Sequence, residues 1–261
     1  MELTLYQIDA FADRPFTGNP AAICPLTEWL PDDVMQAIAT ENNLSETAYF
    51  VPVGDHYHIR WFTLAHEVKL CGHATLASAY VLFNLLGYDR DKLEFESLSG
   101  MLSVTRDGDW YELNFPADEP IPCEAPANIL EAFGEKPTQC LRSMDYILVF
   151  ENEEDVANAQ PISDKLIDHE LRGVAITAPG KEHDFVCRFF APRHGLKEDP
   201  VTGSLYTQLI PYWAERLGKT ELRARQVSKR GGEVRCRLLG DRVAIAGQAA
   251  EYMVGRIRLP D

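Results

Sequence analysis

The sequence predicts an α+β fold made of two similar lobes, each a mostly antiparallel sheet around one buried helix. Many short strand patterns follow one another without the regular strand–helix alternation of a parallel sheet. Residues 75–86 form a helical pattern that is apolar on nearly every side, so other elements must cover all of its faces. Residues 61–75 also resemble residues 189–203, and a repeat of this length implies two related structural units.

The repeat places one ionisable side chain just before a helix in each half of the chain. When the two copies are laid side by side, an aromatic pair matches an aromatic pair and His66 matches His194. Cys71 then matches Asp199, and each copy runs directly into an apolar helical pattern. We therefore expect two helix beginnings that face each other across a cleft, with proton-transfer groups on both walls.

The elements of the first half follow from apolar periodicity and turn residues. A helix is expected at 31–42, with Pro31 in its first turn, and a second at 75–86, with Gly87 as its C-cap. A Gly-Asn-Pro run predicts a loop at 16–20. Strands are expected at 3–11, 47–53, 57–62, 93–96, 100–106 and 110–115.

The second half repeats this plan after a segment with four prolines, residues 116–126, which we interpret as the crossing between the lobes. Helices are expected near 127–133 and at 204–217, where Pro211 should kink or split the second one. Strands are expected at 146–151, 174–178, 184–190, 221–228, 233–239, 242–248 and 252–259.

Composition excludes several classes of function. The 261 residues carry a formal net charge of −15, which argues against binding to nucleic acid or to an anionic membrane surface. No run of about 18 apolar residues is present and residues 1–7 do not resemble a signal peptide. The six cysteines are dispersed without a C-x-x-C pair, which favours reduced thiols and a cytoplasmic location over disulfides or a zinc site.

The two segments before the long helices are candidate anion-binding sites. In residues 199–204, Pro200 shapes the turn, Gly203 permits close approach of a ligand, and Ser204 can cap the helix. Residues 71–75 have the corresponding place before the first helix, and free N–H groups at a helix start favour an anion. The simpler interpretation is two ordinary capped helices, but capping alone does not require the flanking residues to match.

Glu46 is the candidate general base. It lies between a helix and an apolar strand, where burial would raise its pKa toward the range that suits proton transfer. Composition alone favours the simpler interpretation, in which Ser45 and Glu46 belong to a solvated turn. No metal motif competes with this assignment, because Leu70 stands where the second histidine of H-E-x-x-H would be.

Together the motifs resemble the PhzF-like family, named for an isomerase of phenazine biosynthesis, within the diaminopimelate epimerase-like fold. The resemblance covers essentially the whole chain, and the order of the motifs makes it specific. In chain order these motifs are DAF at 9–11, PFTGNPAA at 15–22, SETA at 45–48, CGHAT at 71–75, RFFAP at 188–192 and EDPVTGS at 198–204.

The resemblance implies two pseudo-symmetric lobes with barrel-like sheets, a cofactor-free site between them, and a homodimer. The last strand should return to the first lobe, giving a first lobe of 1–115 plus about 249–261 and a second lobe of 116–248. By the same resemblance Glu46 matches the acid/base carboxylate, and His73 and Asp199 are the other expected catalytic residues. The expected substrate-binding residues are Asn19, Ser45, Cys71, Gly72, Gly203 and Ser204.

The resulting hypothesis is an isomerase that shifts a proton on a small carboxylate-bearing metabolite, with Glu46 as the acid/base group. Two alternatives remain open. Racemases of this fold use two cysteines, so Cys71 with Asp199 or Glu46 would give an amino-acid epimerase, although Cys71 can equally be a buried apolar thiol. The other alternative is a small-molecule binding protein that keeps the fold and catalyses nothing.

Overall fold

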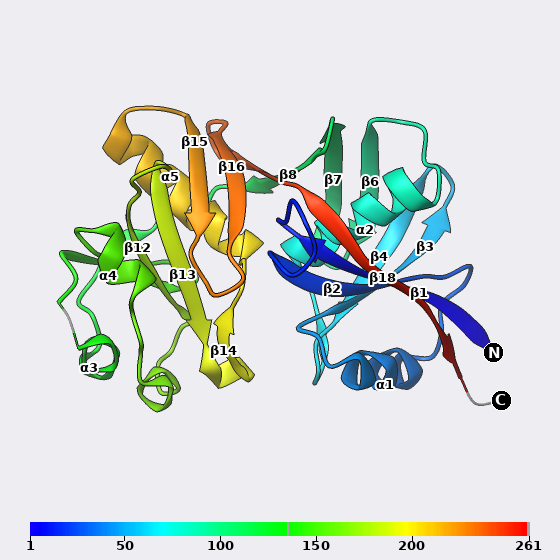
Figure 1. Ribbon diagram of the computed structural model, residues 1–261, viewed down its shortest axis with the longest axis horizontal. Coiled ribbons are helices and arrows are strands. Elements are labelled where there is room, and N and C mark those ends of the chain that lie inside the picture. The colour runs from blue at the N-terminus through cyan, green and yellow to red at the C-terminus, as the bar shows by residue number, and fades with distance from the viewer. Residues whose placement is uncertain (135, 260–261) are drawn as a thin grey trace. The chain divides into compact units, whose positions relative to one another are not determined.

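The computed structural model describes residues 1–134 and 136–259 (Figure 1). The chain divides into two compact units, which are described separately below. Unit 1 comprises Met1–Asn114 and Ala246–Asp261, and unit 2 comprises Phe115–Ile245. Within the described residues, no helix is both long and apolar enough to cross a membrane.

Unit 1 is a curved set of strands around one buried helix. β1 pairs with β18 and β2, β2 runs parallel to β3, β3 pairs with β4, β4 runs parallel to β6, and β6–β7–β8 form an antiparallel meander. The elements are β1 (Glu2–Ala10), β2 (Asn19–Pro25), α1 (Asp32–Asn42), β3 (Thr47–Val53), β4 (His56–Phe62), β5 (Glu67–Val68), α2 (Gly72–Tyr80), a π-helical turn (Val81–Leu85), β6 (Lys92–Ser97), β7 (Gly100–Asp107), β8 (Trp110–Pro116) and β18 (Ala249–Arg258).

The helix α2 is buried along almost its whole length, as its all-round apolar pattern predicts. Every residue from Gly72 to Ala79 is buried, and the helix packs on β1, β2, β3 and β18. Two hydroxyl side chains below the first turn, those of Thr75 and Ser78, are accommodated locally, because they donate to the carbonyls of Cys71 and Ala74. The start of α2 is therefore held rigidly inside unit 1.

Unit 2 repeats this topology with a second buried helix, α5. The parallel pairs β11–β12 and β13–β15 correspond to β2–β3 and β4–β6 of unit 1, and the other pairings are antiparallel. The elements are β9 (Ile121–Pro122), α3 (Ala127–Phe133), β10 (Gln139–Arg142), β11 (Tyr146–Val149), α4 (Glu153–Ala157), a 3₁₀ turn (Ser163–Leu166), β12 (Val174–Pro179), β13 (Phe185–Ala191), a 3₁₀ turn (Pro192–His194), β14 (Leu196–Asp199), a 3₁₀ turn (Gly203–Leu205), α5 (Tyr206–Leu217), β15 (Glu221–Gln226), β16 (Gly232–Leu238) and β17 (Arg242–Gly247).

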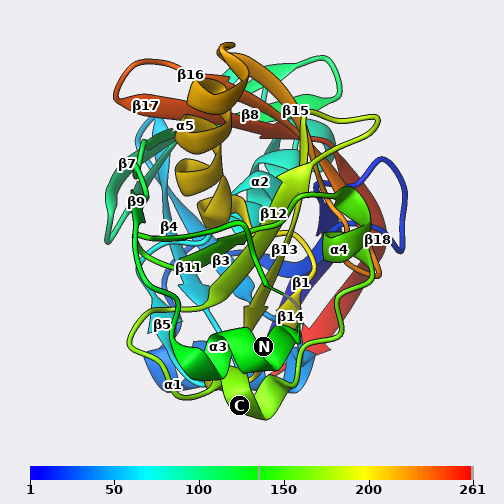
Figure 2. The same ribbon diagram turned by 90° about the vertical axis from the view of Figure 1, so that its left-hand side faces the viewer.

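The helix α5 packs against β15 and β16 (Figure 2) and continues through Pro211, so that of the predicted kink or split, the split does not occur. A proline lacks the N–H that would bond to the carbonyl four residues earlier, here that of Thr207. That carbonyl accepts a hydrogen bond from the backbone N–H of Asp118 at 3.0 Å instead. The proline-rich segment after β8 thus supplies the donor that the helix lacks.

Three further local predictions were wrong. The expected loop at 16–20 ends early because Asn19 already begins β2, and that strand was not predicted. The helix expected at 75–86 begins at Gly72 and changes to a π-helical turn at Val81. Ser204 does not cap a helix through its side chain, since it lies inside the 3₁₀ turn that precedes α5.

Gly18 provides a test of how the chain turns from β1 into β2. Its φ is +64°, and a Cβ at this position would lie 2.1 Å from the carbonyl oxygen of Ala10. Gly54 has a similar φ of +61° with open space around it. We expect Gly54→Ala to lower the free energy of unfolding by about 1–2 kcal/mol through backbone strain alone. Gly18→Ala should cost roughly 1–3 kcal/mol more, because the turn must also move.

Urea unfolding of both variants would measure this difference. Equal losses would show that the contact with the Ala10 carbonyl does not constrain the turn that presents Asn19.

Candidate active site

Three segments of unit 1 bring polar side chains together at the start of α2. Asn19 is the first residue of β2 and is fully buried. Glu46 directly precedes β3, and its backbone carbonyl accepts a hydrogen bond from the Ala22 N–H of β2 at 3.2 Å. Cys71 has an extended backbone and forms the N-cap of α2, so that His73 lies in the first turn of the helix. These positions are far apart in sequence and are joined by the pairing of β2 with β3.

The centre of this cluster is the contact between His73 and Glu46. Nε2 of His73 lies 3.2 Å from Oε2 of Glu46, and the two side chains are 6% and 15% exposed. The other ring nitrogen, Nδ1, lies 3.4 Å from Nδ2 of Asn19 and 3.6 Å from Sγ of Cys71. The hydroxyl of Ser45 donates to Oδ1 of Asn19 at 3.5 Å. The predicted residues Asn19, Ser45, Glu46, Cys71 and His73 therefore form one connected cluster.

The orientation of Asn19 determines the tautomer of a neutral His73. An amide nitrogen can only donate, so Nδ1 of the ring must accept from it. The ring proton then lies on Nε2, the nitrogen 3.2 Å from the carboxylate of Glu46, although the two atoms are not aligned as a hydrogen bond. The sulfur of Cys71 lies beside the same ring nitrogen that accepts from Asn19, at 3.6 Å from Nδ1.

Burial changes the proton affinity of Glu46. Removal of the carboxylate from water raises its pKa above the ordinary value of 4.5, and the hydrogen bond from Ser45 opposes this shift without cancelling it. A carboxyl group with a raised pKa exchanges protons more readily near neutral pH than an exposed one, as a general acid/base requires.

Glu46, Cys71 and His73 also include the atom types of a zinc site. One potential ligand atom from each lies within 4.8 Å of the others. However, Cys71 contacts Nδ1 and Glu46 contacts Nε2, on opposite sides of the ring. An ion binds a histidine through one nitrogen, so this arrangement must change before all three can be ligands. The geometry fits a proton-transfer pair better than a metal centre.

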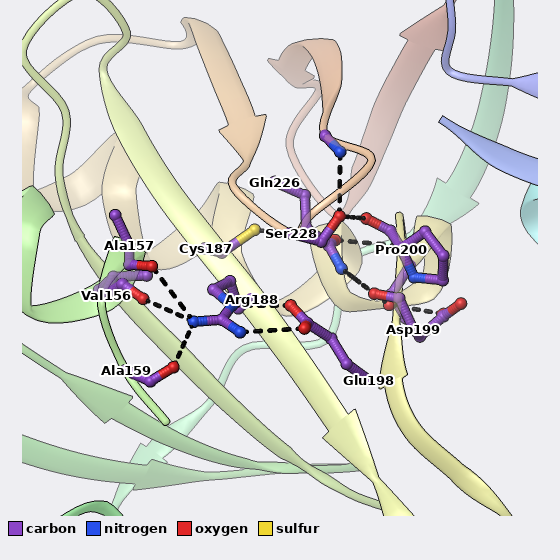
Figure 3. A network of polar contacts seen from close by, with 12 residues as sticks. Val156, Ala157, Ala159, Cys187, Arg188, Glu198, Asp199, Pro200, Gln226 and Ser228 are labelled. Carbon is purple, nitrogen blue, oxygen red and sulfur yellow. Dashed lines mark hydrogen bonds and ion pairs between the residues drawn. The ribbon is translucent and has the colours of Figure 1, made fainter. Parts of the chain in front are cut away.

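In unit 2, the predicted residue Asp199 ends β14 and is 8% exposed. Its Oδ2 accepts from the hydroxyl of Thr202 at 2.6 Å. The side chain of Gln226 donates to the Asp199 carbonyl at 2.7 Å and accepts from the Thr202 N–H at 3.0 Å. The Ser228 hydroxyl donates to the Pro200 carbonyl at 2.7 Å (Figure 3). The turn that carries Asp199 is thus fastened to the end of β15.

Ser204 belongs to a second network in unit 2, beside the buried Gly203. Its hydroxyl accepts from Nη1 of Arg172 at 2.6 Å. Nε and Nη2 of Arg172 donate to both carboxylate oxygens of the fully buried Asp145, at 2.9 and 2.6 Å. Gln208 of α5 donates to the same carboxylate at 2.7 Å. The guanidinium is therefore held in a fixed position next to the start of α5.

Glu198, the first residue of the motif at 198–204, has a structural role. It accepts two hydrogen bonds from Arg188, at 2.7 and 2.9 Å, and so ties β14 to β13 (Figure 3). Arg188 also donates to the backbone carbonyls of Val156, Ala157 and Ala159. This ion pair fixes the position of the backbone immediately before Asp199.

Sequence reasoning missed three residues of these networks, Asp145, Arg172 and Gln226. Each lies outside the recognisable motifs, and its partners are 24 to 63 residues away along the chain. No local pattern distinguishes them, because strand pairing in unit 2 is what brings them to the start of α5.

Comparison with known proteins decides the family. The PhzC-PhzF family, described as phenazine biosynthesis-like protein, matches residues 8–255. The chain belongs to this family. Its similarity to an uncharacterized isomerase of Pseudomonas aeruginosa is 51% identity, over 99% of this chain and 100% of the relative. The family resemblance found in the sequence is confirmed, and this family member is an isomerase.

Solved structures confirm the fold. A PhzF-family protein from Enterococcus faecalis superposes with a TM-score of 0.97 at 45% identity, covering 99% of this chain and all of the other. A probable proline racemase from Agrobacterium radiobacter superposes with a TM-score of 0.65 at 8% identity, covering 99% of this chain and 93% of the other. The second similarity shows the fold alone, and it agrees with the predicted epimerase-like architecture of two related units.

The buried carboxyl group of Glu46 should make stability depend on pH in a defined direction. Because its pKa in the folded protein is raised, its contribution is fully present below the ordinary value of 4.5 and is lost as pH rises through the raised pKa. Glu46→Gln remains neutral at every pH. We therefore expect the variant to be more stable than the natural protein near neutral pH, with the difference shrinking toward acid.

Urea unfolding at a series of pH values would measure this difference. Glu41→Gln, which removes an exposed carboxyl group from the neighbouring α1, is the matched control for the loss of one acidic side chain. Stability of Glu46→Gln that ran parallel to the natural protein at all pH values would contradict the burial of this charge.

Proposed function

We propose that this family member is a cofactor-independent isomerase that shifts a proton on a small, carboxylate-bearing metabolite. The observation that carries the proposal is the pair formed by Glu46 and His73. A carboxyl group with a raised pKa lies 3.2 Å from an imidazole nitrogen at the beginning of a buried helix. This arrangement provides a proton acceptor, a hydrogen-bond donor and a positive helix end within one small region.

In the proposed reaction the carboxylate of Glu46 removes a proton from a carbon of the substrate. The negative charge that develops is stabilised by the positive end of the α2 dipole, at the first turn of the helix. The same carboxyl group then returns the proton to another carbon on the same face. No net oxidation occurs, and His73 retains its proton on Nε2 to hold and stabilise the carboxylate between the two steps.

We further propose that unit 2 supplies substrate-binding groups. Among the described residues, three of the five N–H groups of Arg172 donate to Asp145 and Ser204. The other two are available to a substrate carboxylate, and the guanidinium is already fixed in place. Gly203 and Ser204 would contribute at the same point, and Asp199 would be a second acid/base or orienting group. The family's homodimer and a cytoplasmic location remain predictions.

An epimerase that uses Cys71 is the second candidate. Its support is the position of the thiol at the N-cap of α2, next to His73. Nδ1 of His73 is a base within reach of this thiol, but the raised pKa of the Glu46 carboxyl group favours the Glu46 reaction.

Glu46→Gln tests the proposal. We expect the turnover to fall by about 10²–10⁴-fold, because the amide cannot accept a proton from carbon. The reaction can be followed by NMR in deuterated water, with a panel of small carboxylic acids that carry an acidic C–H bond. Circular dichroism would establish that the variant is folded.

Cys71→Ala distinguishes the two candidates. Under the proposed mechanism it lowers turnover much less than Glu46→Gln, since the thiol takes no part in the proton transfer. If Cys71→Ala abolished deuterium incorporation at an amino-acid α-carbon while Glu46→Gln retained it, the epimerase would be correct and the proposed isomerase mechanism wrong.

A further inference from the structure

Two cysteines of unit 2 that belong to none of the networks described above lie in contact with each other. The Sγ atoms of Cys123 and Cys140 are 3.4 Å apart, and the two residues are separated by 17 positions. Both are free thiols in the structure, as are the other four cysteines. The dispersed spacing that argued against a disulfide framework therefore conceals one close pair.

Strand pairing places the two residues directly opposite each other. Pro122 of β9 faces Leu141 of β10, so the next position along pairs Cys123 with Cys140. The N–H of Cys123 donates to the Cys140 carbonyl at 3.0 Å. Opposed residues of this hydrogen-bonded kind have Cα atoms about 5.5 Å apart, which lies within the range that a disulfide spans. The sulfurs need only approach from contact to a bond of about 2.05 Å.

The two thiols differ in accessibility. Cys140 is 8% exposed and belongs to the apolar core of unit 2, where burial, followed by the neighbouring thiol, raises its pKa to about 12. Cys123 packs against the edge of that core and is only partly buried. An oxidant from solution therefore reaches Cys123 first. Cys140 is the buried thiol that can react with the oxidised Cys123.

We infer that Cys123 and Cys140 form a reversible redox site, in which a peroxide oxidises the pair to an intramolecular disulfide. The Cys123 sulfur attacks hydrogen peroxide, the O–O bond breaks, and a sulfenic acid and water are formed. The Cys140 sulfur then attacks the sulfenic sulfur, the S–O bond breaks, and the hydroxyl leaves with the Cys140 proton as a second water. Two thiols and one peroxide thus give one disulfide and two waters.

The disulfide should be easily reduced. Cβ atoms of directly opposed strand residues lie about 4.5–5.5 Å apart, whereas ordinary disulfides hold them at about 3.5–4.5 Å. The bond must therefore draw β9 and β10 together, and strained disulfides are the ones that thiols reduce readily. Reversibility distinguishes this site from irreversible oxidative damage.

The test is oxidation of the reduced full-length protein with a small excess of hydrogen peroxide, followed by alkylation and peptide mass spectrometry. We expect a peptide pair linked through Cys123 and Cys140, the protection of two of the six thiols, and full return of both thiols after dithiothreitol. Cys140→Ser should abolish the link and leave a sulfenic acid at Cys123, which dimedone traps. Cys123→Ser should give neither the link nor the adduct.

Cys236→Ala is the matched control, because it removes another buried thiol of the same unit and should leave the linked pair unchanged. Alkylation of both Cys123 and Cys140 after peroxide treatment of the natural protein would overturn the inference. A link that joined two chains, or one that resisted dithiothreitol, would overturn it equally. These outcomes are read from the natural protein and do not depend on the folding of any variant.

Discussion

The complete burial of α2 is the constraint on which the chemistry of unit 1 depends. A helix covered on every face cannot shift or rotate without leaving cavities, so the position of its first turn is determined by the whole sheet around it. His73 sits in that turn and meets a carboxylate that β3 presents from another part of the sheet. This packing keeps the carboxyl group of Glu46 out of water, and its removal from water raises its pKa.

Unit 2 has the same topology, but it carries different polar groups at the start of its buried helix. Unit 1 places a thiol and an imidazole at the start of its buried helix. Unit 2 places a carboxylate there, that of Asp199, which accepts a hydrogen bond from the Thr202 hydroxyl, while Gln226 donates to the backbone carbonyl of Asp199. The neighbouring Arg172 is fixed by a buried Asp145, and a buried charge of this kind is tolerable only when it is fully paired. The two units therefore share a fold and differ in the charged groups at the start of their buried helices.

Backbone hydrogen bonds to other segments explain two features that rules based on local sequence do not predict. Pro211 should interrupt α5, but the carbonyl that it orphans is taken by the N–H of Asp118. Asn19 follows a turn-forming glycine and still begins a strand, because β1 offers it a pairing edge. In both cases another segment of the chain provides the backbone hydrogen bond, which rules based on local sequence do not take into account.

The sequence by itself determined the fold class, the repeat, most strands and the order of the motifs that hold Glu46, His73 and Asp199. These properties depend on periodicity and on local residue types, which are legible along a single chain. Only the tertiary structure decided that Nε2 of His73 faces Glu46, that Arg172 is fixed by Asp145, and that Cys123 opposes Cys140. Such contacts depend on strand register between distant segments, and register is set by the packing of the whole sheet rather than by the residues that it brings together.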